Sequence, residues 1–148
     1  LLIGYPEEKD EQKILRKNMT INDFESFDLK AVLSPKRILN LQAQVKDVFT
    51  SEAVEEYIVK IVEETRGKAG EFGKYISYGA SPRASIALYI ASKAEALMKG
   101  RDYVTPEDVQ VVVYPVLRHR VILNYEAEAE DVNTDMVIKH ILGKINAP

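Results

Sequence analysis

Residues 51–66, SEAVEEYIVKIVEETR, decide the fold class of this 148-residue chain. Their apolar side chains recur at the spacing i, i+3, i+4, i+7 and i+8, which places them on one face of an α-helix. These side chains are Val54, Tyr57, Ile58, Ile61 and Val62. The acidic pairs Glu55-Glu56 and Glu63-Glu64 lie on the opposite side, and a solvated helix face is the favoured interpretation of them. The stretch predicts an amphipathic helix that begins at Thr50 or Ser51.

Three hydroxyl–proline pairs mark the starts of further helices. They are Ser34-Pro35, Ser81-Pro82 and Thr105-Pro106, and an apolar-periodic segment follows each. A hydroxyl at the N-cap accepts a hydrogen bond from a backbone N–H, and proline at the first helical position gives up an N–H that had no partner. The pairs predict helices from Pro35, from Pro82 to Lys99-Gly100, and from Pro106. Asp108, three residues after Thr105, comes close to completing a capping box.

The remaining chain predicts two more helices and little strand. A polar helix runs from Pro6 to about Asn18, and Asn133 caps a last helix. The expected inward-facing residues of the helices outside 51–66 are Ile38, Leu41, Val45, Val48, Val109, Val112, Val113, Val116, Val137, Ile138, Ile141, Leu142 and Ile145. Residues 67–79 are expected to form a loop, and residues 31–33, 103–104 and 121–123 short extended pieces. The predicted fold class is all-α, a bundle of about six helices with minor short strands.

Composition argues against several classes of protein. The net charge is −3 and the lysines and arginines are scattered, whereas a nucleic-acid module usually gathers a basic face against phosphate. The chain has no cysteine, which excludes disulfides and thiolate zinc sites and suits the cytoplasm. Its longest uncharged apolar stretch, Val109 to Leu117, is far short of a membrane span. We expect no nucleic-acid binding, no membrane insertion and a cytoplasmic location.

Patterns for catalysis or metal binding are incomplete. His119 and His140 form no HExxH pair, and the sequence has no Gly-x-Ser-x-Gly elbow. Residues 67–74, GKAGEFGK, resemble a phosphate-binding loop, but the second glycine of the motif lies six residues after the first instead of five. Tyr75 also stands where the motif needs a hydroxyl residue for magnesium. We therefore predict no metal site and no enzymatic activity of the chain by itself.

Arg83 is the residue that the helix prediction does not explain. It falls in the first turn of the helix from Pro82, where the positive end of the helix dipole disfavours a cation by about 0.3–1 kcal/mol. A nearby anion would remove that cost. From the residues alone the anion is either a carboxylate of this domain, which is the favoured interpretation, or a bound phosphate.

Arg118-His119-Arg120 forms a second basic cluster, at the end of the helix from Pro106. Positive charge suits the C-terminal end of a helix dipole. The favoured interpretation is a helix-end clamp onto a carboxylate. A contact with a neighbouring subunit is the alternative.

At residues 79–84, GASPRA, the sequence resembles the sensor 2 segment of the MoxR family of AAA+ ATPases. Four other blocks are similar to the family, in the same order and at familiar spacing, so the resemblance extends over essentially the whole chain. They are residues 2–6 (LIGYP), 54–66 (VEEYIVKIVEETR), 100–109 (GRDYVTPEDV) and 115–120 (PVLRHR). Five blocks in register are much more specific than any one of them.

The resemblance implies a C-terminal helical lid domain over residues 6–148, with residues 1–5 as the remnant of the last strand of an ATPase core. Arg83 then corresponds to the sensor 2 arginine, in a supporting catalytic role, and Ser81, Pro82 and Arg83 are expected to contact the nucleotide. ATP and Mg²⁺ belong to the full-length parent ATPase, and none is expected bound to this chain alone.

The resemblance also implies partners. They are the chain's own ATPase core, neighbouring subunits of a hexameric ring, and a von Willebrand A-type domain protein. The family is similar to chaperones that assemble or activate protein complexes, including methanol dehydrogenase.

Two other functions stay open from the residues. The chain could be a free-standing helical adaptor that binds protein partners without nucleotide, in which Arg83 only pairs with a carboxylate. A DNA-binding helical module is disfavoured by the net charge.

Overall fold

The structure is a computed structural model that describes residues 4–18, 30–67 and 69–148. The chain divides into two units, Leu1–Leu39 and Asn40–Pro148. The first unit contains α1 (Glu8–Asn18), which matches the helix predicted after Pro6. An exposed ion pair, Lys13 Nζ to Asp10 Oδ1 at 2.7 Å, joins two of its turns.

The predicted remnant strand at residues 1–5 lies mostly outside the described residues, and Gly4 and Tyr5 belong to no strand. The prediction of an extended piece at residues 31–33 is wrong. Val32 and Leu33 form a bend, and none of the three residues belongs to a strand.

Helix α2 (Pro35–Asp47) begins where the hydroxyl–proline pair predicts, but none of its residues is buried. Ile38 and Leu41, expected to face a core, are 43% and 39% exposed. Val48, the fourth residue of that predicted face, lies beyond the helix end and is buried. Periodicity therefore located this helix and its apolar side chains, but Ile38 and Leu41 are not buried within the unit to which each belongs.

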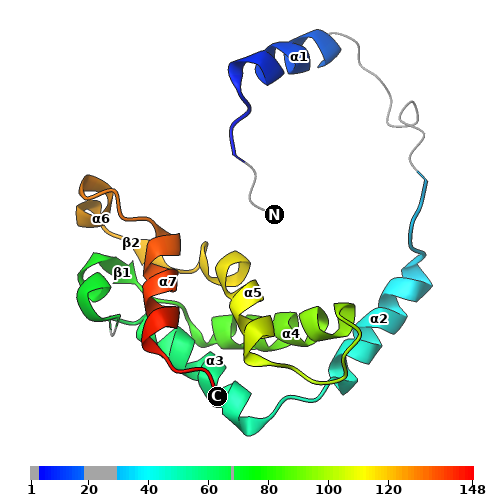
Figure 1. Ribbon diagram of the computed structural model, residues 1–148. Coiled ribbons are helices and arrows are strands. Elements are labelled where there is room, and N and C mark those ends of the chain that lie inside the picture. Colours follow the sequence, from blue (N-terminus) through cyan, green and yellow to red (C-terminus); the bar gives the residue numbers. More distant parts are fainter. Residues whose placement is uncertain (1–3, 19–29, 68) are drawn as a thin grey trace. The chain divides into compact units, whose positions relative to one another are not determined.

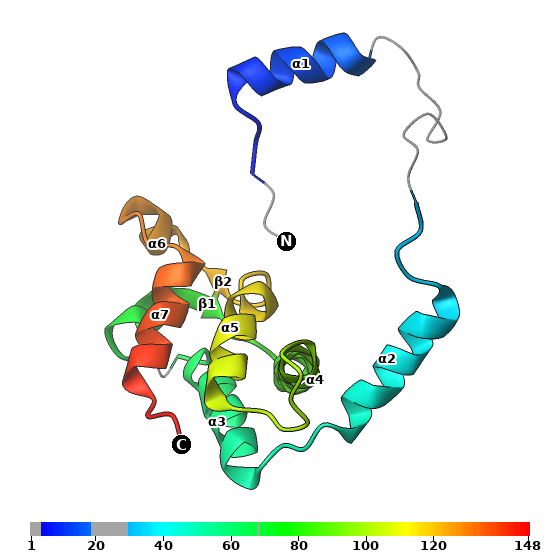
Figure 2. The ribbon, with the colours of Figure 1, turned by 45° about the vertical axis from the view of Figure 1, so that its right-hand side comes forward.

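The second unit is a bundle of four longer helices, in which α5 packs against α3, α4 and α7 (Figures 1 and 2). The helices are α3 (Glu52–Glu64), α4 (Pro82–Met98), α5 (Pro106–Leu117) and α7 (Thr134–Lys144). All five residues of the apolar face predicted for the stretch 51–66 are buried. The largest buried side chains around them include Leu88, Leu117, Ile138 and Ile141. Each such side chain contributes roughly 1.5–3 kcal/mol by its removal from water.

The predicted inward faces of α5 and α7 are largely confirmed. Val109, Val112, Val113, Val137, Ile138 and Ile141 are buried, whereas Val116, Leu142 and Ile145 are only partly buried against the core. Leu117 takes the fully buried position at the end of α5.

Local signals set the helix ends as predicted. Ser51 and Asn133 accept hydrogen bonds from the N–H of Val54 (3.4 Å) and Met136 (3.0 Å). Thr105 and Asp108 form a full capping box at α5. At the end of α4, Gly100 has φ +74°, a left-handed conformation that glycine adopts without steric cost.

The predicted loop 67–79 is more ordered than expected. It contains a 3₁₀ helix, η2 (Gly70–Tyr75), and the strand β1 (Ile76–Tyr78). Strand β1 pairs antiparallel with β2 (Ile122–Leu123), which confirms the extended piece expected at 121–123. Phe49 and Tyr103 form an isolated parallel bridge, and the short helix α6 (Tyr125–Ala129) was not predicted. The described fold is mostly helical with one two-stranded sheet, so the predicted fold class is confirmed. None of its described helices has the length and apolar character that a membrane span requires.

Candidate functional site at the start of α4

The N-terminus of α4 lies where the sequence predicts, but Ser81 does not form the predicted capping hydrogen bond. Ser81 is the N-cap residue in an extended conformation, and Pro82 occupies the first helical position. The first helical hydrogen bond runs from the Ala84 N–H to the Ser81 carbonyl oxygen at 2.8 Å. The Ser81 hydroxyl makes no capping hydrogen bond within the described chain, so it remains available to a ligand.

Arg83 projects from this first turn into solvent. It is exposed, and α4 has no acidic residue in its first turn. Among the described residues of the unit 40–148, no carboxylate forms an ion pair with Arg83. The carboxylate partner that sequence reasoning favoured is therefore not found in this part of the chain, and the unfavourable contact with the helix dipole is uncompensated there.

Two residues at the end of α3 hold the backbone that leads into α4. The Ala80 N–H donates to the Thr65 hydroxyl oxygen (2.9 Å), and Arg66 Nε donates to the Ala80 carbonyl oxygen (2.9 Å). Thr65 is fully buried and Ala80 is 1% exposed. Sequence reasoning assigned neither Thr65 nor Arg66 a role, because both bonds join residues far apart along the chain.

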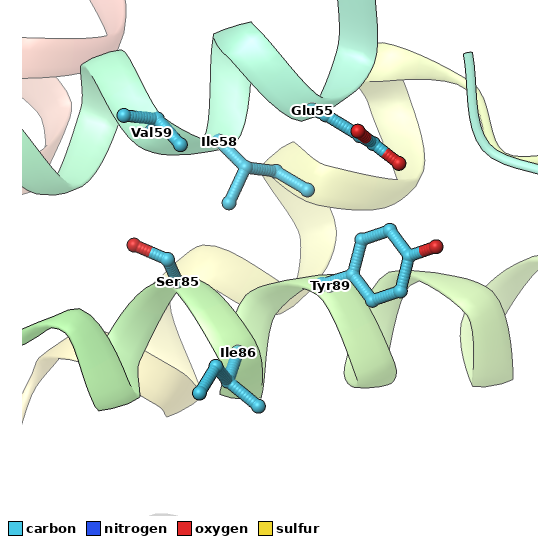
Figure 3. Close-up of a pocket in the computed structure, with 6 residues that line it drawn as sticks. All are labelled: Glu55, Ile58, Val59, Ser85, Ile86 and Tyr89. Atoms are coloured by element: carbon cyan, nitrogen blue, oxygen red, sulfur yellow. The ribbon is translucent and has the colours of Figure 1, made fainter. Parts of the chain in front are cut away.

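A groove runs between α3 and α4 beside this site. Its volume is about 310 Å³, and Figure 3 shows Ile58 pointing from α3 toward α4, with Ser85 and Tyr89 on the opposite helix. Val59 and Ile86 also line it, and both are exposed.

The apolar surface of the groove continues along α4. Ile86 and Ile90 follow Arg83 by three and seven residues, so all three lie on one helix face. Ile90 is also exposed. The start of α4 thus presents an arginine at one end of an uncovered apolar stripe.

The far end of α4 is joined to α5 by the buried carboxylate of Asp108. It accepts two hydrogen bonds from Arg101 (2.6 and 2.8 Å), one from Lys99 (3.0 Å), and bonds from both the N–H (2.9 Å) and the hydroxyl (3.2 Å) of Thr105. Burial by itself would raise the pKa of Asp108. The hydrogen bonds outweigh that effect and hold the pKa well below its ordinary value of 3.8.

The second basic cluster is a structural clamp. Arg118 makes a bidentate pair with Asp135 of α7, with N–O distances of 2.6 and 2.7 Å. Arg120 donates to the Val116 carbonyl oxygen at 2.6 Å and contacts His119. The predicted clamp onto a carboxylate is confirmed for Arg118.

The two histidines have different surroundings. His140 stacks on Phe72, with ring centroids 4.8 Å apart, and its Nδ1 lies 3.9 Å from a Glu71 carboxylate oxygen. His119 instead contacts Arg120. In the described residues no group of three or more histidine or carboxylate side chains is placed to hold a metal ion.

Comparison with known proteins identifies the domain type. Residues 72–141 match the family described as the AAA lid domain. The chaperone MoxR1 of Mycobacterium tuberculosis is 35% identical over 99% of this chain and 39% of its own length. The protein MoxR of Methylorubrum extorquens is 30% identical over 79% of the chain and 37% of its own length.

A solved structure supports the same conclusion. A crystal structure from Cytophaga hutchinsonii, of a protein assigned as an ATPase, matches with a TM-score of 0.76 and 38% identity. The match covers 99% of this chain and 45% of the other. The chain therefore spans less than half the length of each relative that it matches here.

Proposed function

Because this chain belongs to the MoxR family of AAA+ proteins, as its lid domain, we propose that it acts as the sensor 2 lid of a longer ATPase. In this role Arg83 contacts the phosphates of ATP bound to a nucleotide-binding core that lies outside this chain. Ser81 and Pro82 shape the turn that presents Arg83. The lid then couples ATP binding and hydrolysis to the assembly or activation of partner protein complexes.

The observation that carries the proposal is the exposed position of Arg83 in the first turn of α4. A guanidinium stays charged, and its planar fork can bond two phosphate oxygens. Arg83 is exposed and has no carboxylate partner among the described residues of its own unit, 40–148. A phosphate would supply the anion that the first turn of α4 lacks, and the Ser81 hydroxyl is available beside it. These residues fit a phosphate tail. Its Mg²⁺ would need ligands from the core, because no metal-binding group is described here.

The apolar stripe supports contact of the same face with the nucleotide-binding core. Val59, Ile86 and Ile90 are each about half exposed, and a contiguous exposed apolar surface usually marks an interaction site. A core placed over this face would cover the stripe and bring its nucleotide to Arg83. From the family resemblance we also propose three properties of the full-length protein. It is cytoplasmic, it assembles as a hexameric ring, and it works with a von Willebrand A-type partner.

The test compares ATP hydrolysis and ATP affinity in the protein encoded by the full reading frame. Replacing Arg83 with alanine should lower turnover at least tenfold, equivalent to about 1.4 kcal/mol of transition-state stabilisation. Arg83→Lys should retain only part of the wild-type turnover, because lysine keeps the positive charge but lacks the planar guanidinium that can bond two oxygens. Arg37→Ala is a matched control, since Arg37 also lies in the first turn of a helix after a Ser-Pro pair.

Unchanged turnover and affinity in Arg83→Ala would contradict the sensor 2 role. That result would favour the alternative function, a helical adaptor that binds protein partners through the groove between α3 and α4.

A further inference from the structure

The peptide that precedes α4 is held on both of its polar groups. The N–H and the carbonyl oxygen of Ala80 bond to neighbouring residues, Thr65 and Arg66, at 2.9 Å each. Ala80 is buried, and buried backbone groups need such partners. Both contacts come from the C-terminal end of α3. They therefore fix the position and orientation of the Ala80 peptide relative to that helix.

Thr65 is suited to this contact by a hydrogen bond of its own. Its hydroxyl donates to the Val62 carbonyl oxygen at 2.6 Å, which fixes where its proton points. A hydroxyl has one proton and two lone pairs, so the oxygen is left as an acceptor directed away from α3. The Ala80 N–H occupies that acceptor position.

Gly79 shows how closely the two backbones approach. A Cβ atom built on Gly79 would lie 2.3 Å from the Thr65 carbonyl oxygen and 2.8 Å from Arg66 Cα. Only glycine fits at this distance. The segment cannot move toward α3 because of this contact, and the two hydrogen bonds oppose movement away from it.

Little rotational freedom remains between Ala80 and Arg83. Proline fixes φ at position 82 and restricts Ser81 before it. Ser81 also accepts the first helical hydrogen bond, from Ala84, which is fully buried. The direction set at Ala80 is therefore passed on to the first turn of α4.

We propose that Thr65 and Arg66 are positioning residues for Arg83, acting through Ala80. This inference rests on the sensor 2 role proposed above. A charged group acts on a phosphate only when it is correctly placed, and an error of about 1 Å can reduce rate roughly a hundredfold. Loss of either contact lets the start of α4 shift, which should lower kcat more than it changes KM for ATP.

The experiment measures ATP turnover in the full-length protein. Thr65→Val keeps the shape of the side chain and removes the hydroxyl, and Thr65→Ser restores the hydroxyl. Arg66→Ala removes an exposed side chain together with its hydrogen bond to the Ala80 carbonyl oxygen, so it tests the second contact. Thr65→Val and Arg66→Ala should each lower kcat about fivefold or more, and Thr65→Ser should stay within about twofold of wild type.

Double variants separate positioning from general stability. If Thr65 and Arg66 act through Arg83, adding either change to Arg83→Ala should cause no further loss of kcat. Losses that multiply in the double variants would overturn the inference. A large rise in KM for Arg66→Ala would also overturn it, because that result indicates direct contact of Arg66 with nucleotide.

The single variants separate this inference from the proposed function. Wild-type turnover in Thr65→Val and Arg66→Ala, together with an impaired Arg83→Ala, would refute positioning alone. Wild-type turnover in Arg83→Ala would refute the sensor 2 role, and with it the basis of this inference.

Discussion

Asp108 offers the sharpest test of how α4 and α5 are held together. Asp108→Asn keeps the size of the side chain and removes its charge, which faces Arg101 and Lys99 at 2.6–3.0 Å. The new amide N–H₂ group cannot accept a hydrogen bond, so Arg101 loses at least one of its two hydrogen bonds to residue 108.

The expected loss of unfolding free energy follows from the burial of the Asp108 carboxylate. Breaking a buried ion pair typically costs about 3–5 kcal/mol. The side chains of Arg101 and Lys99 are 24% and 41% exposed, so water replaces part of what they lose, and we expect the low end, about 3 kcal/mol. For a unit of this size the loss lowers Tm by roughly 12 °C. The assay is urea unfolding of the chain followed by circular dichroism. Asp102→Asn, an exposed change in the same turn, is the control.

The stability difference between wild type and Asp108→Asn should also depend on pH. The folded-state pKa of Asp108 lies below its ordinary value of 3.8. A carboxyl with a depressed pKa contributes stability that is fully present above the unfolded value and is lost as pH falls toward the folded one. The difference in unfolding free energy between wild type and Asp108→Asn should be constant from pH 5 to 8 and should narrow below about pH 4. A loss under about 1 kcal/mol, or a difference that does not narrow in acid, would refute this account of Asp108.

Three smaller predictions concern the stability of the bundle, each measured by urea unfolding. Ile138→Ala should cost about 2–5 kcal/mol, because this fully buried side chain would leave a cavity; a cost under 1 kcal/mol would mean that the site collapses. Gly79→Ala should cost roughly 1–3 kcal/mol through its clash with the end of α3, whereas Gly143→Ala, in open space within α7, should be neutral or stabilising. Asp135→Asn should cost at most about 1 kcal/mol, because its pair with the arginine after α5 is partly exposed; a larger loss would show a buried role.

The parts of the fold that the sequence predicted well are those determined by neighbours along the chain. The stripe of α3, the proline starts of α4 and α5, and the left-handed Gly100 all depend on residues within two turns. Local hydrogen bonding and steric limits decide such features before tertiary packing contributes.

The missed features depend on packing between distant segments. Strand β1 exists because it pairs with β2 more than forty residues later, and three residues give too short a pattern to be recognised in a glycine-bearing loop. The exposed Ile38 and Leu41 of α2 have the same periodicity as a buried face. Periodicity identifies an apolar face, but not which surface covers it.

The candidate site was predictable in part for the same reason. Arg83 was found from sequence because its position in the first turn conflicts with the helix dipole, which is a local property. Thr65 and Arg66 carry no such conflict. Their hydrogen bonds to Ala80 span 15 and 14 residues, and only the folded chain brings them together.

The attachment of α4 bears on how a nucleotide could move the lid. Thr65 and Arg66 hold the segment before its first turn, and Asp108 fastens its last turn through Lys99. Between these ends the buried Lys93 donates to the Lys46 carbonyl oxygen at 2.9 Å, which ties α4 to the end of α2. A helix held at three points cannot tilt without the elements that hold it. If Arg83 contacts phosphate as proposed above, a force on Arg83 would be passed through these contacts to α3, α5 and the end of α2, so the start of α4 would not move as an isolated loop.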